Sequence, residues 1–201
     1  MLAFASYSIA LLYSVESTKG QNTSLVLLQQ LKLQNGDLIF RRGISIESQI
    51  VLLSDRSSEY SHVGLIYNLN GKPFVIHSVP AESGEITEYI KMESIQDFID
   101  EEKSEKFAIY RLKDQSLNKV QKASSFAYNC YQHKYRFDND YDLNSDKQLY
   151  CTELIWKAYM SAGVDLVCNR LKNINFIITN KTMIMPSSII ESKLLQNIYS
   201  N

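Results

Sequence analysis

The chain has 201 residues, 45% of them hydrophobic and 21% charged, and these proportions are typical of a folded domain rather than a disordered or fibrous chain. Lys and Arg number 21 against 22 Asp and Glu, so the net charge is -1 and no basic surface for a nucleic acid is expected.

The N-terminal part resembles a secretory leader that lacks its positive charge. Residues 2–15 are uncharged, and residues 15–17 resemble a signal-peptidase site, but no Lys or Arg precedes Lys19. The apolar run is also short for a bilayer, so no integral membrane span is expected. Residues 1–24 are interpreted either as a leader or as an N-terminal helix with a linker, and residues 25–201 as one domain. Export to the bacterial envelope and a cytoplasmic location both remain open.

Local patterns over the first half of the domain predict a helix, a strand, a second helix and a hairpin. Residues 25–33 favour a helix and residues 37–41 a strand. Ser45 is the expected cap of the second helix, which carries apolar residues on one face at Ile46, Ile50 and Leu53. Two β-rich runs, 61–67 and 72–78, flank an Asn-Gly pair and predict an antiparallel hairpin.

Helices dominate the expected second half. A charged stretch over residues 94–102 is typical of a helix, and residues 107–111 favour a strand. Two further helices are expected, one with an apolar stripe at Val120, Ala123, Phe126, Ala127 and Cys130, and one over residues 151–162 that is closed by Gly163. Pro186 is read as the start of a last helix over residues 187–199.

The three cysteines do not form a metal-binding pattern. They contain no CxxC pair, and no histidine lies at zinc-finger spacing from them, so no metal site is predicted. Cys130 and Cys168 are interpreted as buried apolar residues rather than a disulfide. Cys151 differs because it stands at the start of an expected helix, where backbone N–H groups and the helix dipole lower a thiol pKa.

Two of the three histidines lie on the expected hairpin. His62 begins one strand, with Gly64 leaving room beside its ring, and His77 lies on the opposing strand with its side chain on the same face. A cysteine nucleophile needs an imidazole base, and His77 is placed to orient His62 in that role. Two satisfied strand histidines are the alternative. His133, in a polar helix end, is a poorer candidate for the base.

Three motifs together resemble a known family. GDLIF at 36–40, YSHVG at 60–64 and YCTEL at 150–154 resemble the YiiX/YebB-like group of NlpC-type cysteine hydrolases. The papain-like fold of this group is circularly permuted, so the histidine precedes the cysteine, as it does here. The resemblance runs from Leu33 to Gly163. It implies an α+β fold, a circularly permuted papain-like (NlpC-type) domain in which an antiparallel sheet packs against helices.

The resemblance also implies roles for single residues. Cys151 matches the family nucleophile and His62 the family base, while His77 occupies a third position that close relatives often fill with glutamate. Glu153 matches a family position, although capping of the first helical turn is the competing interpretation. Tyr60 would line the site or support the oxyanion, and a packed aromatic is the alternative.

These roles imply a cysteine hydrolase that cleaves an amide bond through a thioester and needs no cofactor. The expected substrate is a peptide, a murein peptide or an acyl lipid. A lipid acyltransferase or acyl hydrolase on the same fold is the alternative, and a non-catalytic binding module is a third interpretation. The oligomeric state is left open.

Overall fold

The computed structural model describes residues 31–80, 88–175 and 180–201. The expected leader over residues 1–24, and most of the expected helix over residues 25–33, lie outside these residues. The chain divides into two units, Met1–Leu33 and Gln34–Asn201, and the second unit carries every element described below. No helix among the described residues is long and apolar enough to cross a membrane.

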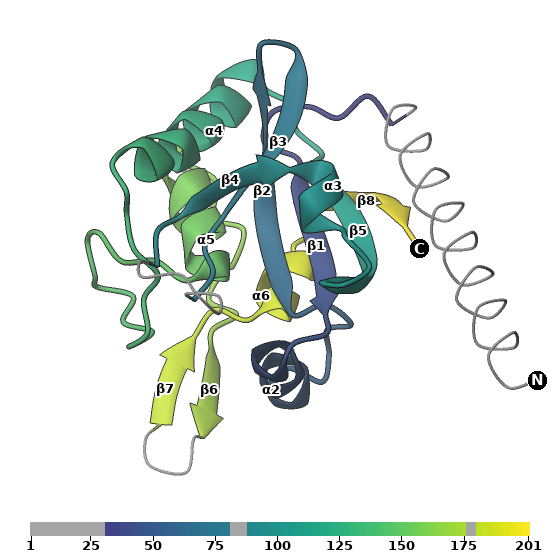
Figure 1. The fold of residues 1–201 in the computed structure, drawn as a ribbon. Coiled ribbons are helices and arrows are strands. Elements are labelled where there is room, and N and C mark those ends of the chain that lie inside the picture. Colours follow the sequence, from purple (N-terminus) through teal and green to yellow (C-terminus); the bar gives the residue numbers. More distant parts are fainter. Residues whose placement is uncertain (1–30, 81–87, 176–179) are drawn as a thin grey trace, which may run out of the picture. The chain divides into compact units, whose positions relative to one another are not determined.

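An antiparallel six-stranded sheet forms the centre of the second unit (Figure 1). Every hydrogen-bonded pair of neighbouring strands in it is antiparallel. In spatial order the strands are β4 (Lys91–Ser94), β3 (Lys72–His77), β2 (His62–Leu69), β1 (Leu38–Gly43), β5 (Ser104–Leu112) and β8 (Leu195–Ser200).

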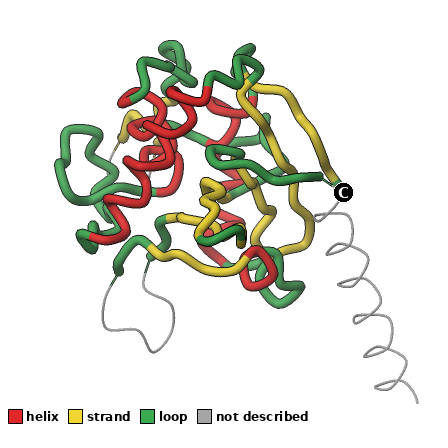
Figure 2. The backbone as a smooth tube through the Cα atoms, turned by 90° about the horizontal axis from the view of Figure 1, so that it is seen from above, coloured by secondary structure: helices red, strands yellow, loops and turns green. Residues whose placement is uncertain are grey.

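Two long helices, α4 (Leu117–Gln132) and α5 (Cys151–Ser161), pack against each other and against β2 (Figure 2). The main core lies between them and the sheet, and its buried members include Leu38, Phe40, Leu65, Ile76, Ala123, Leu154 and Tyr159. A short helix, α3 (Ile95–Phe98), contacts β3 and β4. The remaining elements are α2 (Ile46–Ser54), α6 (Pro186–Ile190) and a separate hairpin of β6 (Lys172–Asn175) and β7 (Asn180–Met183).

The expected central hairpin is confirmed, and its register sets the site. Asn70 and Gly71 both have positive φ values, 53° and 80°, as the tight turn between β2 and β3 requires. Leu65 pairs with Ile76, so Gly64 lies opposite His77. His62 precedes Gly64 by two residues on β2, so its side chain points to the same face of the sheet as that of His77. The two histidines are therefore diagonal neighbours on adjacent strands.

Several other expected elements are also present. The strand over 37–41 is β1, the strand over 107–111 is part of β5, and the two predicted long helices are α4 and α5. Gly163 closes α5 with a φ of +72°. Ser45 caps α2, because its side chain accepts a hydrogen bond from the Ser48 N–H.

Three predictions are wrong. Only residues 95–98 of the charged stretch are helical, and β4 precedes them. The last helix ends at Ile190, because the β-forming residues that follow pair with the edge of β5 as strand β8. Cys168 is exposed rather than buried, in a turn with a positive φ.

Candidate active site

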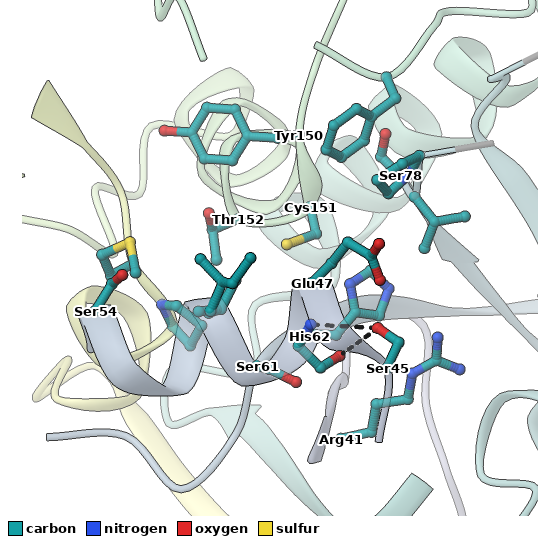
Figure 3. Close-up of a pocket in the computed structure, with 18 of the residues that line it drawn as sticks. Arg41, Ser45, Glu47, Ser54, Ser61, His62, Ser78, Tyr150, Cys151 and Thr152 are labelled. Carbon is teal, nitrogen blue, oxygen red and sulfur yellow. Dashed lines mark hydrogen bonds between the residues drawn. The ribbon is translucent and has the colours of Figure 1, made fainter. Parts of the chain in front are cut away.

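Cys151 is the first residue of α5 and borders a pocket of about 800 Å³. The helix begins there because Tyr150 has an extended backbone, while its carbonyl already accepts the first helical hydrogen bond from Leu154. His62 lines the same pocket, and Figure 3 shows both side chains, with the Cys151 sulfur directed into the pocket. The sequence prediction that brings Cys151 and His62 to one site agrees with this placement.

The surroundings of Cys151 favour its neutral thiol over the thiolate. Burial raises its pKa to about 11, against the effect of the backbone N–H groups of Val63 and Thr152. The sequence predicts a lowered thiol pKa from the helix N-terminus, and the first-turn amide does act in that direction, but burial has the larger effect. Val63 directly follows His62 on β2, so the effect of its backbone N–H on the Cys151 pKa indicates that the sulfur lies close to that strand.

The rings of His62 and His77 are in direct contact. His62 Nε2 lies 2.9 Å from His77 Nδ1, and both residues are buried. The Phe98 ring covers the pair, with ring centroids 5.6 Å from His62 and 5.2 Å from His77. Gly64 makes this arrangement possible, because a Cβ there would come within 3.2 Å of the His77 Cβ and 2.3 Å of a Val75 methyl. The space that Gly64 leaves beside the His62 ring is thus occupied by His77 and Val75.

Glu93, on β4, extends the pair to a third side chain that the sequence prediction missed. Its Oε1 lies 3.1 Å from His77 Nε2, although the ring N–H is not aligned on the oxygen as in a regular hydrogen bond. Lys103 Nζ is 3.8 Å from the other carboxylate oxygen, and Arg41 is 4.0 Å from Oε1. The alternation of apolar Ile90 and Met92 with polar neighbours is a signal for a strand, but it does not indicate that this strand pairs with β3.

The charges of these three groups are set by their surroundings. Burial lowers the pKa of His62 well below 6.5, and the positive charge of Arg41 lowers it further. Burial also lowers the pKa of His77, although Glu93 acts in the opposite direction. Burial alone would raise the pKa of Glu93, but His77, Lys103 and Arg41 outweigh it and lower that pKa. At neutral pH the site therefore holds two neutral imidazoles and one carboxylate.

The two remaining sequence candidates lie away from the pocket. Tyr60 is buried in the core, where its ring centroid is 6.2 Å from that of Phe40, and it does not line the pocket. Glu153 is fully buried below the first turn of α5, and its carboxylate accepts a long, 3.4 Å hydrogen bond from the Tyr150 N–H. These placements correspond to the packing and capping alternatives. His133 is exposed, with Nδ1 2.9 Å from the Asn129 carbonyl oxygen.

No group of three or more His, Cys, Asp or Glu side chains in the described part of the chain is arranged to hold a metal ion. The chemistry available at this site is that of a thiol, two imidazoles, a carboxylate and the amides at the start of α5.

Comparisons with known proteins agree with this arrangement. A family model described as permuted papain-like amidase enzyme, YaeF/YiiX, C92 family, matches residues 32–199. The uncharacterized protein YiiX of Escherichia coli K12 is 28% identical over 130 residues, which are 64% of this chain and 58% of that protein. The crystal structure of metalloprotein yiiX from Escherichia coli O157:H7 has a TM-score of 0.68 at 22% identity, covering 84% of this chain and 97% of that one. The structural likeness is a likeness of fold.

Proposed function

The chain belongs to the YaeF/YiiX family of permuted papain-like amidases, and from this premise we propose that it is a cysteine amidase with Cys151 as nucleophile and His62 as base. His77 and Glu93 are positioning residues in this proposal. The observation that carries it is the 2.9 Å contact between the His62 and His77 rings, beside the pocket that Cys151 lines.

The order of the polar atoms selects one tautomer for each ring. The ionised carboxylate of Glu93 can only accept, so the proton of neutral His77 belongs on Nε2, which faces it. His77 Nδ1 then carries a lone pair and accepts the proton of His62 Nε2. This leaves His62 Nδ1 unprotonated and available as the base for the thiol. Glu93 thereby supplies the negative charge that a neutral histidine lacks in the third position of a triad.

In the proposed reaction His62 Nδ1 takes the thiol proton as the Cys151 sulfur attacks the carbonyl carbon of the amide. The carbonyl oxygen becomes an oxyanion, which the first-turn amides of α5 stabilise. The C–N bond then breaks, His62 returns its proton to the departing amine, and the acyl group remains on Cys151 as a thioester. A neutral thiol and a neutral imidazole are the starting state that the two shifted pKa values favour.

Water completes the cycle. His62 takes a proton from water, whose oxygen attacks the thioester carbonyl carbon; the C–S bond then breaks, the acid leaves, and His62 returns the proton to the Cys151 sulfur. The same site would transfer the acyl group to another acceptor if that acceptor replaced water, which is the chemistry of the acyltransferase alternative.

The proposal is tested by replacing Cys151 with serine and comparing the variant with Cys168→Ser, an exposed cysteine outside the pocket. Chromogenic amides and murein-derived peptides serve as substrates. We expect Cys151→Ser to lose activity by a factor on the order of 10³ or more, and Cys168→Ser to retain it. An acyl adduct on Cys151 should be seen by intact-protein mass spectrometry after brief exposure to substrate. Equal activity in both variants would refute the nucleophile assignment.

A further inference from the structure

A second concave site lies on the connection between α4 and α5 (Figure 1). Residues 133–136 form one side of it and residues 145–148 the other, and together they line a groove of about 520 Å³. None of these residues lines the catalytic pocket. We call this site the basic groove, because its lining includes three cationic side chains, Lys134, Arg136 and Lys147.

The backbone of the two sides is held by hydrogen bonds between them. The Arg136 N–H donates to the Lys147 carbonyl oxygen at 2.9 Å, and the Leu149 N–H donates to the Arg136 carbonyl oxygen at 2.9 Å. Arg136 also forms a β-bridge with Tyr89, outside this connection. The Arg136 and Lys147 side chains therefore start from a fixed backbone and are brought to one groove by the fold.

The groove concentrates positive charge in a chain whose net charge is -1. Its three cations are exposed, and Asp146 is the one carboxylate among the residues that line it. With His133 counted as neutral, the lining carries a net charge of +2. This charge is local, because the composition of the whole chain is balanced.

Two of the three cations have no ion-pair partner among the residues that the structure describes. Lys119, on the neighbouring α4, is paired with Asp114 at 2.6 Å. Arg136 and Lys147 form no such pair with a described carboxylate. Like charges on adjacent segments repel each other, and an anion bound between them would offset that repulsion.

The end of α4 accounts for only part of this cluster. Cations next to a helix C-terminus interact favourably with the helix dipole, and this effect is confined to the last turn. It explains Lys134, which directly follows the C-cap residue His133. It does not explain Arg136 and Lys147, which lie beyond that turn and are adjacent because the chain folds back on itself.

We propose that the basic groove binds a phosphate monoester. Arginine presents a planar fork of N–H donors that matches phosphate oxygens, and lysine adds a compact positive charge. A phosphate monoester carries a charge of about −1.5 to −2 at pH 7, which balances the net charge of the groove, whereas a single carboxylate would balance only half of it. The volume of about 520 Å³ also accommodates the organic part of a small ester.

Titration calorimetry on the full chain with glycerol 3-phosphate tests this proposal. We expect saturable one-to-one binding with a Kd below about 1 mM at low ionic strength, and weaker binding as salt screens the charges. Vesicles that contain phosphatidic acid present the same phosphate monoester on a lipid surface, with phosphatidylcholine vesicles as the control. Binding of free glycerol 3-phosphate identifies a soluble ligand, and binding to the phosphatidic acid vesicles alone identifies a lipid headgroup. Binding to neither overturns the inference.

Two double variants separate the groove from the overall charge of the protein. Arg136→Gln with Lys147→Gln should weaken binding at least about tenfold, because two charged donors are lost. Arg56→Gln with Lys122→Gln is the matched control, since it removes the same two residue types from exposed positions outside the groove. It should leave the Kd unchanged. Equal weakening in the two double variants would show attraction by net charge and would overturn the site.

A gain of affinity provides an independent check. Asp146→Asn removes the carboxylate of the groove, and it should tighten binding by about two- to fivefold. The melting temperature without ligand should be the same in all these variants, because every substituted side chain is exposed. An Asp146→Asn protein that is folded and binds no more tightly than wild type would contradict the proposal. These readouts are independent of Cys151, so they leave the amidase proposal unaffected.

Discussion

His77 Nδ1 lies 2.9 Å from His62 Nε2, so the orientation of the His62 ring depends on a second ring that is itself placed against a carboxylate. In the proposed site, the negative charge of Glu93 adds to the neutral His77 that contacts His62. We therefore expect the activity to depend on Glu93 as well as on the two histidines.

Replacing Glu93 with glutamine should lower kcat by about 10- to 100-fold with a smaller change in KM, because the charge that favours protonated His62 is lost. Glu93→Asp should recover part of the activity. Steady-state kinetics and the pH profile of kcat/KM measure the effect. Glu105→Gln is the matched control, since Glu105 forms an exposed ion pair with Arg42 on the same sheet. If Glu93→Gln lowers only the melting temperature, the positioning role is refuted.

The activity should show a broad pH optimum. In the proposed mechanism Cys151 and His62 together carry one proton, and a second proton binds only below pH 6.5, because the pKa of His62 is well below that value. The pair loses its last proton near the thiol pKa of about 11. We therefore expect kcat/KM to stay level across neutral pH, while alkylation of Cys151 by iodoacetamide accelerates as pH rises towards about 11. An acidic limb at the ordinary histidine pKa of 6.5 would contradict these assignments.

Glu153 should make stability depend on pH. Burial raises its pKa from 4.5 to about 7, although Lys157, at 2.9 Å, acts in the opposite direction. The folded state then binds the proton more tightly than the unfolded state, so the free energy of unfolding falls as pH rises from 4.5 to about 7, by roughly 3 kcal/mol, and is level above that range.

Denaturant unfolding at several pH values measures this dependence. In Glu153→Gln the contribution should disappear, which makes the variant more stable relative to wild type at alkaline pH than at acidic pH. Lys157→Met should extend the falling region to higher pH, because the cation that lowers the Glu153 pKa is gone. A constant difference between wild type and Glu153→Gln across the range would show that the carboxyl does not titrate differently on folding.

Asp37 should matter for stability and not directly for chemistry. It is 1% exposed and directly precedes β1, and Arg111 on β5 donates two 2.7 Å hydrogen bonds to its carboxylate. Asp37→Asn removes the negative charge that accepts both hydrogen bonds from the partly buried Arg111 guanidinium, and we expect a loss of about 2 kcal/mol in the free energy of unfolding. Glu105→Gln, which removes the exposed ion pair with Arg42, should lower the free energy of unfolding by less than about 1 kcal/mol. Activity per folded molecule should remain near that of wild type in both variants.

The sequence was sufficient for the parts of the site that depend on short-range patterns. The Asn-Gly turn places two histidines on one face of a hairpin, and Cys151 stands where a helix begins, so both could be assigned from local signals. The motif order also indicated the permuted fold to which the family model corresponds.

Features that depend on contacts between residues distant in the sequence could not be predicted from local patterns. Glu93 lies on a four-residue strand whose charged neighbours resemble a solvated helix, and its role depends on pairing with β3. Strand β8 forms because β5 offers an unpaired edge, which no local pattern reveals. The raised thiol pKa is a consequence of burial, a property of the folded molecule. The apolar stripe on α2 was recognised, but the sequence did not indicate that it faces a pocket and solvent.

The stepwise arrangement of His62, His77 and Glu93 across three neighbouring strands has a consequence for folding experiments. Leu65 pairs with Ile76, and a slip of one residue in this pairing would carry the His77 side chain to the face of the sheet opposite His62; Val75 pairs with Glu93, and a slip there would carry Glu93 to the face opposite His77. Mispaired molecules can keep normal secondary-structure content and compactness, yet they would be inactive. The fraction of activity recovered after refolding therefore counts the molecules whose strands have found the correct partners, which spectroscopic signals of folding do not distinguish.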